Sequence, residues 1–406
     1  MIISKYYKWL LIAFVIWPIS DYLFTLLGYN ASFLRYSILS ISTLFIIRLY
    51  FVSKKNTDNL SGIFKLLLLF ALYWLAFRCI ASYGDLLKPD YNYIGLKEFL
   101  SGNFIVFFSF YLVNIKIPLQ FLKTLLKVTY ILSIIFIFIG VPMFSYFTSD
   151  IFNNAEYFVR NFSLPGMFLF LLFPYQKKSV NRVLFLSLFL ALLMMMILAR
   201  RNIILFQVSA IFFLGLVLVL SSSQSVKKNK VIIILSFIFI SALSLSFIIF
   251  GQFDFTLLIS KSSTGFSSRG QLILEFVSIF NSTPIDWYIG RGPLGSFSSH
   301  LGSELDDQRT LIENGYLQII LKQGLLFLIP FVLLSFLSIY KGFFSSKNHL
   351  SKVCAILVIV NLIDMVGYGL PFLGIKYLNF LIAFSLCLSP VVRNMSDIEI
   401  KRIIKL

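Results

Sequence analysis

The sequence predicts an all-α polytopic integral membrane protein with about 12 transmembrane helices. Two observations support this fold class. The 406-residue chain is 59% apolar and only 13% charged, with a mean hydropathy of +0.90, whereas a soluble domain is roughly half apolar and a quarter charged. Its apolar residues also form runs of about 20, the length that a helix needs to cross a bilayer. This composition excludes a soluble enzyme, a nucleic-acid-binding module and a disordered chain.

The apolar runs follow one another along a single integral membrane domain, 1–406. Because lipid offers no partner for an unpaired backbone group, each run is expected to be a helix. The run at 162–176 is the weakest of the set, since it is short and contains Pro165 and Pro174. The predicted spans are 9–28, 34–52, 62–82, 99–115, 128–147, 162–176, 183–199, 203–222, 231–250, 313–340, 353–370 and 372–392.

The distribution of basic residues predicts the orientation of these spans. The chain carries 35 lysines and arginines and a formal net charge of +18. If both termini face the cytoplasm, 21 of these residues lie on the inner side, 11 lie on the outer side, and the remainder fall within spans. Every inner loop is then enriched in positive charge, as the positive-inside rule requires. The basic charge therefore reports topology, and we expect membrane lipids and no nucleic acid around the chain.

One outer loop, 251–312 between the ninth and tenth spans, is much longer than the others. A long loop in a compact bundle is usually functional. Within it, 268–281 predicts an amphipathic helix, because its apolar residues recur at helical spacing. These residues are Ile273, Phe276, Val277 and Phe280. The helix either covers the bundle at the membrane interface or holds Arg269 over an outward-facing cavity.

The segment Gly290–Gly295 spells G-x-G-x-x-G. A dinucleotide site needs this motif inside a βαβ unit, and the segment follows no predicted strand, so we reject that interpretation. What remains is a tight turn with exposed backbone N–H groups and one arginine, Arg291. Such a turn can receive an anion, or it simply reverses the chain.

Two arginines, Arg200 and Arg201, form nearly the whole outer turn between the spans at 183–199 and 203–222. Guanidinium groups match phosphate oxygens bidentately and are less hydrated than an ammonium group. The pair therefore predicts a site for a lipid-linked phosphate or pyrophosphate. Contact with phospholipid headgroups is the alternative.

Acid–base candidates on the outer side are Glu313, which opens the tenth predicted span, and His300, which lies in a serine-rich stretch. A carboxylate at a helix start is also favoured by the helix dipole alone. No cluster has metal-ligand spacing, so no metal is expected. Asp364, Arg78 and Lys322 fall within predicted spans, where a charge is costly, so each is expected to face the interior or a partner.

Four motifs follow one another in the second half of the chain. They are Ser267–Gln271, Tyr288–Phe297, Glu313–Gln318 and Gln323–Leu325. Their order resembles that found in the superfamily of bacterial O-antigen polymerases (Wzy-type) and O-antigen ligases. Arg160, Arg200 and Arg201 are weaker points of similarity. Ligases of this superfamily carry a histidine immediately before the asparagine that starts the span after the long loop. Glu313 occupies that place here, so the resemblance favours a polymerase.

The resemblance implies a glycosyltransferase at the outer (periplasmic) face of the bacterial inner membrane. A glycan on undecaprenyl pyrophosphate would move onto another lipid-linked repeat unit, without a metal or another cofactor. The lipid-linked oligosaccharide and a chain-length regulator protein are the implied partners. The implied residues are Arg269, Arg200, Arg201, Arg291 and Arg160 for pyrophosphate, Asn314 and Tyr316 for substrate, and Glu313 or His300 as the base.

Three other functions fit parts of the sequence. A lipid-linked glycan flippase or transporter also has about 12 spans, but its outer loops are usually short and its substrate sites lie at the midplane between repeats. An O-antigen ligase would need the missing histidine. A transferase that uses polyprenyl-phosphate sugars normally carries an acidic metal motif, which Asp85 and Asp90 match poorly.

Overall fold

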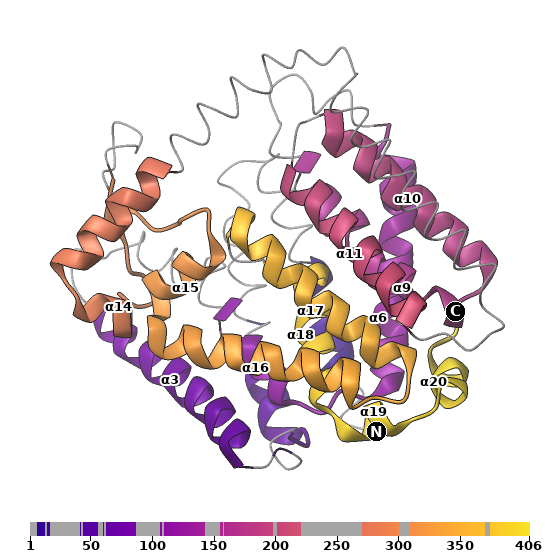
Figure 1. The fold of residues 1–406 in the computed structure, drawn as a ribbon, viewed down its shortest axis with the longest axis horizontal. Helices are drawn as coiled ribbons and strands as arrows, with labels where there is room; N and C mark the ends of the chain where they lie inside the picture. Colours follow the sequence, from indigo (N-terminus) through magenta and orange to yellow (C-terminus); the bar gives the residue numbers. More distant parts are fainter. Residues whose placement is uncertain are drawn as a thin grey trace.

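The structure is a computed structural model, and its described part is mostly helical (Figure 1). Among the described residues, four helices are long and apolar enough to cross a bilayer: Leu119–Gly140, Lys178–Ile197, Leu325–Phe344 and His349–Gly367. To this extent the predicted class, an all-α membrane protein, is confirmed. The described residues are 6–12, 14–16, 41, 44–55, 60, 62–86, 106–107, 109–142, 155–156, 158–197, 201–220, 270–299, 308–369 and 374–406.

The first half of the described chain contributes four long helices. These are α3 (Gly62–Leu86), α6 (Leu119–Ile135), α10 (Lys178–Ile197) and α11 (Arg201–Leu220). The helix α6 begins nine residues before the predicted span at 128–147. The prediction started too late because Lys123 and Lys127 interrupt the apolar run, yet both lie on the exposed side of the helix, where a lysine can keep its charge in water.

Three short elements replace the predicted span at 162–176. They are the π-helix η6 (Val159–Ser163), α9 (Gly166–Leu171) and the 3-10 helix η7 (Phe173–Tyr175). Pro165 and Pro174 interrupt the backbone hydrogen bonding here, as a proline does in any helix. Nearly all of α9 is buried, so the broken backbone lies inside protein, the one place where a membrane-embedded chain tolerates it. The 3-10 helix η4 (Ser109–Asn114), in the predicted span 99–115, is likewise largely buried.

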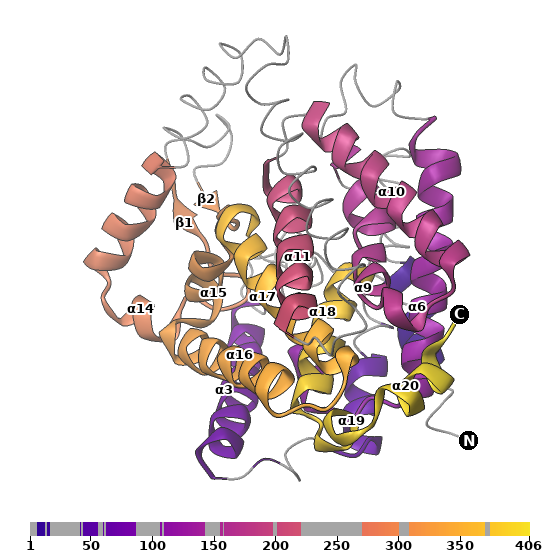
Figure 2. The same cartoon turned by 45° about the vertical axis from the view of Figure 1, so that its right-hand side comes forward.

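The prediction of one helix at 313–340 is wrong. The structure divides this segment into α15 (Gly315–Gln323) and α16 (Leu325–Phe344), which meet at Gly324 with a φ of 72°. After α16 come α17 (His349–Tyr368) and α18 (Ile375–Leu388), then the short α19 (Pro390–Asn394) and α20 (Asp397–Ile404). The helix α17 packs against α11, α16 and α18, so it is the centre of the bundle (Figures 1 and 2).

The second part of the long predicted loop forms a small packed unit over α15 (Figure 2). Residues 270–282 are helical, and α14 (Ile285–Ile289) and the antiparallel strands β1 (Phe297–Ser298) and β2 (Gln308–Arg309) follow. Its core contains Leu272, Phe276, Phe280, Phe297, Ile312, Ile320 and Leu321. Ile273, predicted on the apolar face of the helix, is 37% exposed, and Leu272 takes its place at 5%.

Loops predicted to lie on the inner side gather at one end of the bundle. The backbone N–H of Lys116 donates to the carbonyl oxygen of Lys54, and that of Lys347 donates to the carbonyl oxygen of Arg393, both at 2.9 Å. The helix α20 also packs against α6. These loops therefore share one end, while the side of the membrane that this end faces stays a prediction.

Asn348 holds two of these loops together. Its Oδ1 accepts a hydrogen bond from Ser351 N (2.8 Å) at the start of α17, and its Nδ2 donates to the carbonyl oxygens of Val392 (2.7 Å) and Met395 (3.0 Å). We expect Asn348→Ala to lower the free energy of unfolding by about 2–3 kcal/mol, because a cap and buried hydrogen bonds are lost. Asn348→Ser keeps only the cap, so its loss in thermal unfolding should be intermediate. Equal stability of both variants and the wild type would contradict this role.

Candidate active site

A buried cluster of charged side chains lies near the C-terminal end of α17. Asp364 Oδ2 accepts hydrogen bonds from Lys376 Nζ (2.6 Å) and Arg160 Nη1 (3.5 Å), and Arg160 Nε donates to Glu156 Oε1 (2.9 Å). The ammonium group of Lys376 also lies 4.1 Å from the centre of the Phe206 ring on α11. The two acids balance the two bases, which is the form in which buried charge is tolerated within a membrane.

A π-helix presents Arg160 to this cluster. The element η6 carries the arginine, and it packs against a second π-helix, η5 (Phe136–Gly140), that extends α6. The contact is close, because a Cβ atom on Gly140 would lie 2.3 Å from the ring of Phe158. Single π-helical turns occur frequently at functional sites. The π-helical backbone and the buried charges therefore both indicate a functional site at Arg160.

The start of α15 lies against the same end of α17. Asn314 Oδ1 caps α15 by accepting from the N–H groups of Tyr316 and Leu317, and its Nδ2 donates to Val366 O, all at 3.1 Å. The Tyr316 hydroxyl donates to Leu362 O (2.8 Å). Both polar side chains thus fasten α15 to α17, and their contact with substrate stays a prediction.

Glu313, the predicted base, directly precedes this cap, and its side chain is exposed. Gly315, two residues later, packs so closely on the end of α17 that a Cβ atom there would lie 2.7 Å from Gly369 O. The last third of α17 therefore separates Glu313 on one side from the buried cluster on the other. The structure brings Glu313, Asn314 and Arg160 to one end of one helix, although they come from distant parts of the sequence.

The backbone of Arg201, from the predicted arginine turn, lies at the start of α11, the helix that brings Phe206 to the cluster. Arg201 is the first residue of α11, five residues before Phe206, which is about 8 Å along a helix axis. Arg200, Arg269 and His300 lie outside the described residues, as does the side chain of Arg201. Their predicted roles stay predictions.

Arg291 lies elsewhere and is fully engaged within the fold. Its Nε donates to Asp286 Oδ2 (2.7 Å), its Nη1 to Ser296 O (2.9 Å) and its Nη2 to Thr283 Oγ1 (3.3 Å). The guanidinium also lies over the ring of Phe280, 5.1 Å from its centre. These contacts favour the chain-reversing interpretation of the G-x-G-x-x-G turn, with Arg291 as its anchor.

Two of the charged residues predicted within spans donate hydrogen bonds to the backbone of the Gly290–Gly295 turn. Lys322 is fully buried and donates from Nζ to Gly295 O (2.7 Å), and Arg78 Nη2 donates to Gly290 O (3.0 Å). Together with Asp364 in the buried cluster, they contact partners inside the protein. A single sequence predicts the need for such partners but does not identify them.

We expect Arg291→Ala and Asp286→Ala to lower the free energy of unfolding by similar amounts, about 1–2 kcal/mol, because each breaks the same charged hydrogen bond. The double variant should cost much less than the sum of the two, and thermal unfolding of all three measures this coupling. If Arg291→Ala abolishes function while Asp286→Ala leaves it intact, Arg291 contacts the substrate instead.

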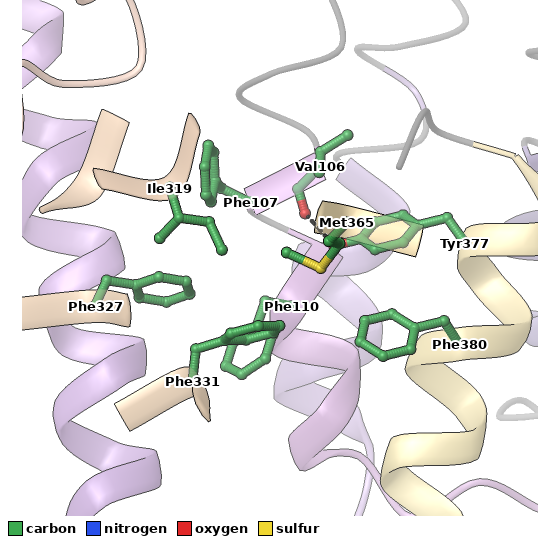
Figure 3. A pocket seen from close by; sticks show the side chains of 9 residues that line it. All are labelled: Val106, Phe107, Phe110, Ile319, Phe327, Phe331, Met365, Tyr377 and Phe380. Carbon is green, nitrogen blue, oxygen red and sulfur yellow. Dashed lines mark hydrogen bonds between the residues drawn. The ribbon is translucent and has the colours of Figure 1, made fainter. Parts of the chain in front are cut away.

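An aromatic recess is lined in part by α17 and α18, the helices that carry Asp364 and Lys376 (Figure 3). Met365 and Tyr377, the neighbours of Asp364 and Lys376, contribute to its wall, and the Tyr377 hydroxyl donates to Val106 O (2.8 Å). The recess is small, with a cavity volume of about 20 Å³. The complete lining is Val106, Phe107, Phe110, Ile319, Phe327, Phe331, Met365, Tyr377 and Phe380.

Within the described part of the chain, no group of three or more His, Cys, Asp or Glu side chains is placed to hold a metal ion.

Sequence reasoning missed two members of the cluster. Glu156 precedes Arg160 by four residues, a spacing that pairs opposite charges on a helix, so a signal was present. The topology prediction counted Lys376 among the outer basic residues. It lies, however, inside the apolar run 372–392, which directly follows the run 353–370 that contains Asp364. Oppositely charged residues in consecutive spans are a usable signal for such a pair.

Comparison with known proteins adds no relative to these observations. No family model matches the chain, and no curated protein and no solved structure shows significant similarity to it.

Proposed function

We propose that the protein is a polysaccharide polymerase. It transfers a glycan from undecaprenyl pyrophosphate onto a second lipid-linked repeat unit at the outer face of the bacterial inner membrane, in a bundle of about 12 spans. One observation carries most weight. Glu313 and the cluster around Arg160 lie at the same C-terminal end of α17, on its two sides, whereas its N-terminal end joins the basic loops through Asn348. Charged groups at the less basic end of an apolar bundle suit a lipid-linked anionic substrate.

The residues near this end match what the reaction needs. The bond between the anomeric carbon and the pyrophosphate oxygen breaks, and a bond to an acceptor hydroxyl oxygen forms. Undecaprenyl pyrophosphate leaves with the electron pair, so its developing negative charge must be offset, and arginines supply positive charge without a metal. Arg200, Arg201 and Arg269 are the proposed contacts, together with Arg160. A carboxylate takes the hydroxyl proton, and Glu313 is the exposed candidate.

A gel of surface polysaccharide from a deletion strain tests the proposal. Loss of the polymer ladder, with a single repeat unit still attached to its final lipid acceptor, is the expected result. Polymer that stays on undecaprenyl pyrophosphate would identify a ligase. Absence of repeat units from the outer surface would identify a flippase.

Substitution of the predicted arginines should abolish polymer formation while the protein still inserts. We expect Arg200→Ala and Arg269→Ala to lose the ladder, and Arg269→Lys to do little better, because lysine cannot make a bidentate contact. The matched control is Arg182→Ala, since Arg182 is exposed near the opposite end of the helix that precedes Arg200. A normal ladder in Arg269→Ala cells would exclude that residue from the site.

A further inference from the structure

The polar groups around the ion cluster are incompletely hydrogen-bonded. Oδ1 of Asp364, Oδ1 of Asn361, Oδ1 of Asn379 and Nε2 of Gln207 have no hydrogen-bond partner within the described part of the chain. All four residues are at most 5% exposed. Buried polar atoms are almost always hydrogen-bonded in folded proteins, and an exception needs an explanation such as a catalytic role or a bound molecule.

These atoms belong to one region of the bundle. Asn361 and Asp364 are three residues apart and share a face of α17, as Lys376 and Asn379 do on α18. Gln207 follows Phe206, whose ring contacts Lys376, and α17 packs against both α11 and α18. On these three packed helices, three carbonyl or carboxylate oxygens therefore lack a donor, and one amide nitrogen lacks an acceptor, among the described residues.

The chemistry of these atoms indicates their ligand. Unpaired oxygens need O–H or N–H donors, and the amide nitrogen needs an acceptor. A hydroxyl group supplies both, so a saccharide with several hydroxyls fits this set, whereas a hydrocarbon chain fits none of it. An anion is disfavoured as the ligand, because these three oxygens are acceptors and would repel its negative charge.

We propose that Asp364 binds the attacking hydroxyl of the acceptor glycan and takes its proton, in place of the exposed Glu313. The inference rests on the proposed function and names the base of that reaction. The proton moves to Asp364 Oδ1, the hydroxyl oxygen bonds to the anomeric carbon, and undecaprenyl pyrophosphate leaves with the electron pair of the broken bond. The proton passes to solvent after product release.

Lys376 and Arg160 are positioning residues in this scheme. Both contact the other carboxylate oxygen, Oδ2, within 3.5 Å, so they fix the orientation of Asp364 and offset its charge. Oδ1 is left to meet the hydroxyl. A hydrogen bond made in such a buried place is stronger than the same bond in water.

A charge-balanced pair of substitutions separates a base from a mere counter-ion. Asp364→Asn with Lys376→Met removes one negative and one positive charge and keeps both side chains close to their original size. The assay measures initial polymerisation rates of the purified protein on undecaprenyl-pyrophosphate-linked repeat units extracted from the deletion strain. Thermal unfolding checks the fold, and Glu399→Gln, at the exposed start of α20, is the control that should keep its full rate.

A folded double variant that is at least about 100-fold slower supports the proposal, because general bases contribute that much or more. A folded double variant with wild-type rate overturns it. If the double variant does not accumulate, Asp364→Glu decides, since it keeps every charge but moves the carboxylate. A slower rate with unchanged KM then supports the base, and an unchanged rate overturns it. An intact ladder in the deletion strain would instead refute the proposed polymerase.

Discussion

Replacing Asp364 with alanine is expected to lower the free energy of unfolding by about 3–5 kcal/mol, the usual cost of removing one partner from a buried ion pair. The loss is large because two cations depend on this carboxylate. Arg160 is 5% exposed and the side chain of Lys376 is 11% exposed. Without Asp364, Glu156 is the one acid of the described cluster that remains to balance both charges.

The physical reason can be separated from loss of packing by a second substitution. Lys376→Met removes the excess positive charge and keeps an apolar chain against Phe206. Asp364→Ala with Lys376→Met should therefore recover at least about 2 kcal/mol of the loss, since replacing a buried pair by apolar groups is often nearly neutral. Thermal unfolding of the two single variants and the double variant in one detergent measures the coupling. Additive losses would show that the pair has no energetic significance.

This experiment also separates the stability of the cluster from its proposed chemistry. Charge balance alone should restore folding, whereas a proton acceptor at position 364 should be irreplaceable for activity. A variant that regains stability and stays inactive would assign both roles to Asp364. One that regains both would leave it a structural counter-ion.

The sequence predicts the fold class better than it predicts where one helix breaks into two. Long apolar runs predict helices whose backbone hydrogen bonds are local, so α10, α11 and α17 lie close to their predicted ranges. The break at Gly324 follows a short polar interruption of the apolar segment, Lys322 and Gln323, which is too brief to predict the end of a helix. It depends on a tertiary contact with a segment about 30 residues earlier, which composition does not report.

The candidate site was predictable in part for the same reason. Arg160 and Glu313 were found because charged residues stand out in an apolar chain. The pairing of Arg160 with Asp364, and of Asp364 with Lys376, follows from the packing of η6, α17 and α18. Arg291 was also predicted as a binding residue because of its charge, but an arginine on a loop can equally stabilise the fold. Its contacts, such as the one with Asp286, indicate that structural role.

Two glycines from separate sequence motifs explain one another in the structure. Gly290 and Gly324 have φ values of 67° and 72°, and their ψ values are −178° and 179°, a backbone region that essentially only glycine adopts. A Cβ atom on either residue would lie 2.6 Å from the backbone nitrogen of the other. The chain therefore crosses itself here at a distance that no side chain permits.

Gly324→Ala is accordingly expected to cost on the order of 3 kcal/mol or more, as the sum of backbone strain and steric overlap. Its Cβ would lie 2.1 Å from Tyr288 O, so the turn must move away from α15, and the hydrogen bond from Arg78 to Gly290 would be lost. Gly290→Ala should cost as much, and the double variant little more, because either methyl group alone separates the two segments. Gly215→Ala is the matched control: no atom of the described residues lies within 4 Å of its Cβ position inside α11, where alanine should stabilise the helix by about 0.5–1 kcal/mol. Thermal unfolding that ranks Gly324→Ala beside Gly215→Ala would show that the crossing contributes nothing to the fold.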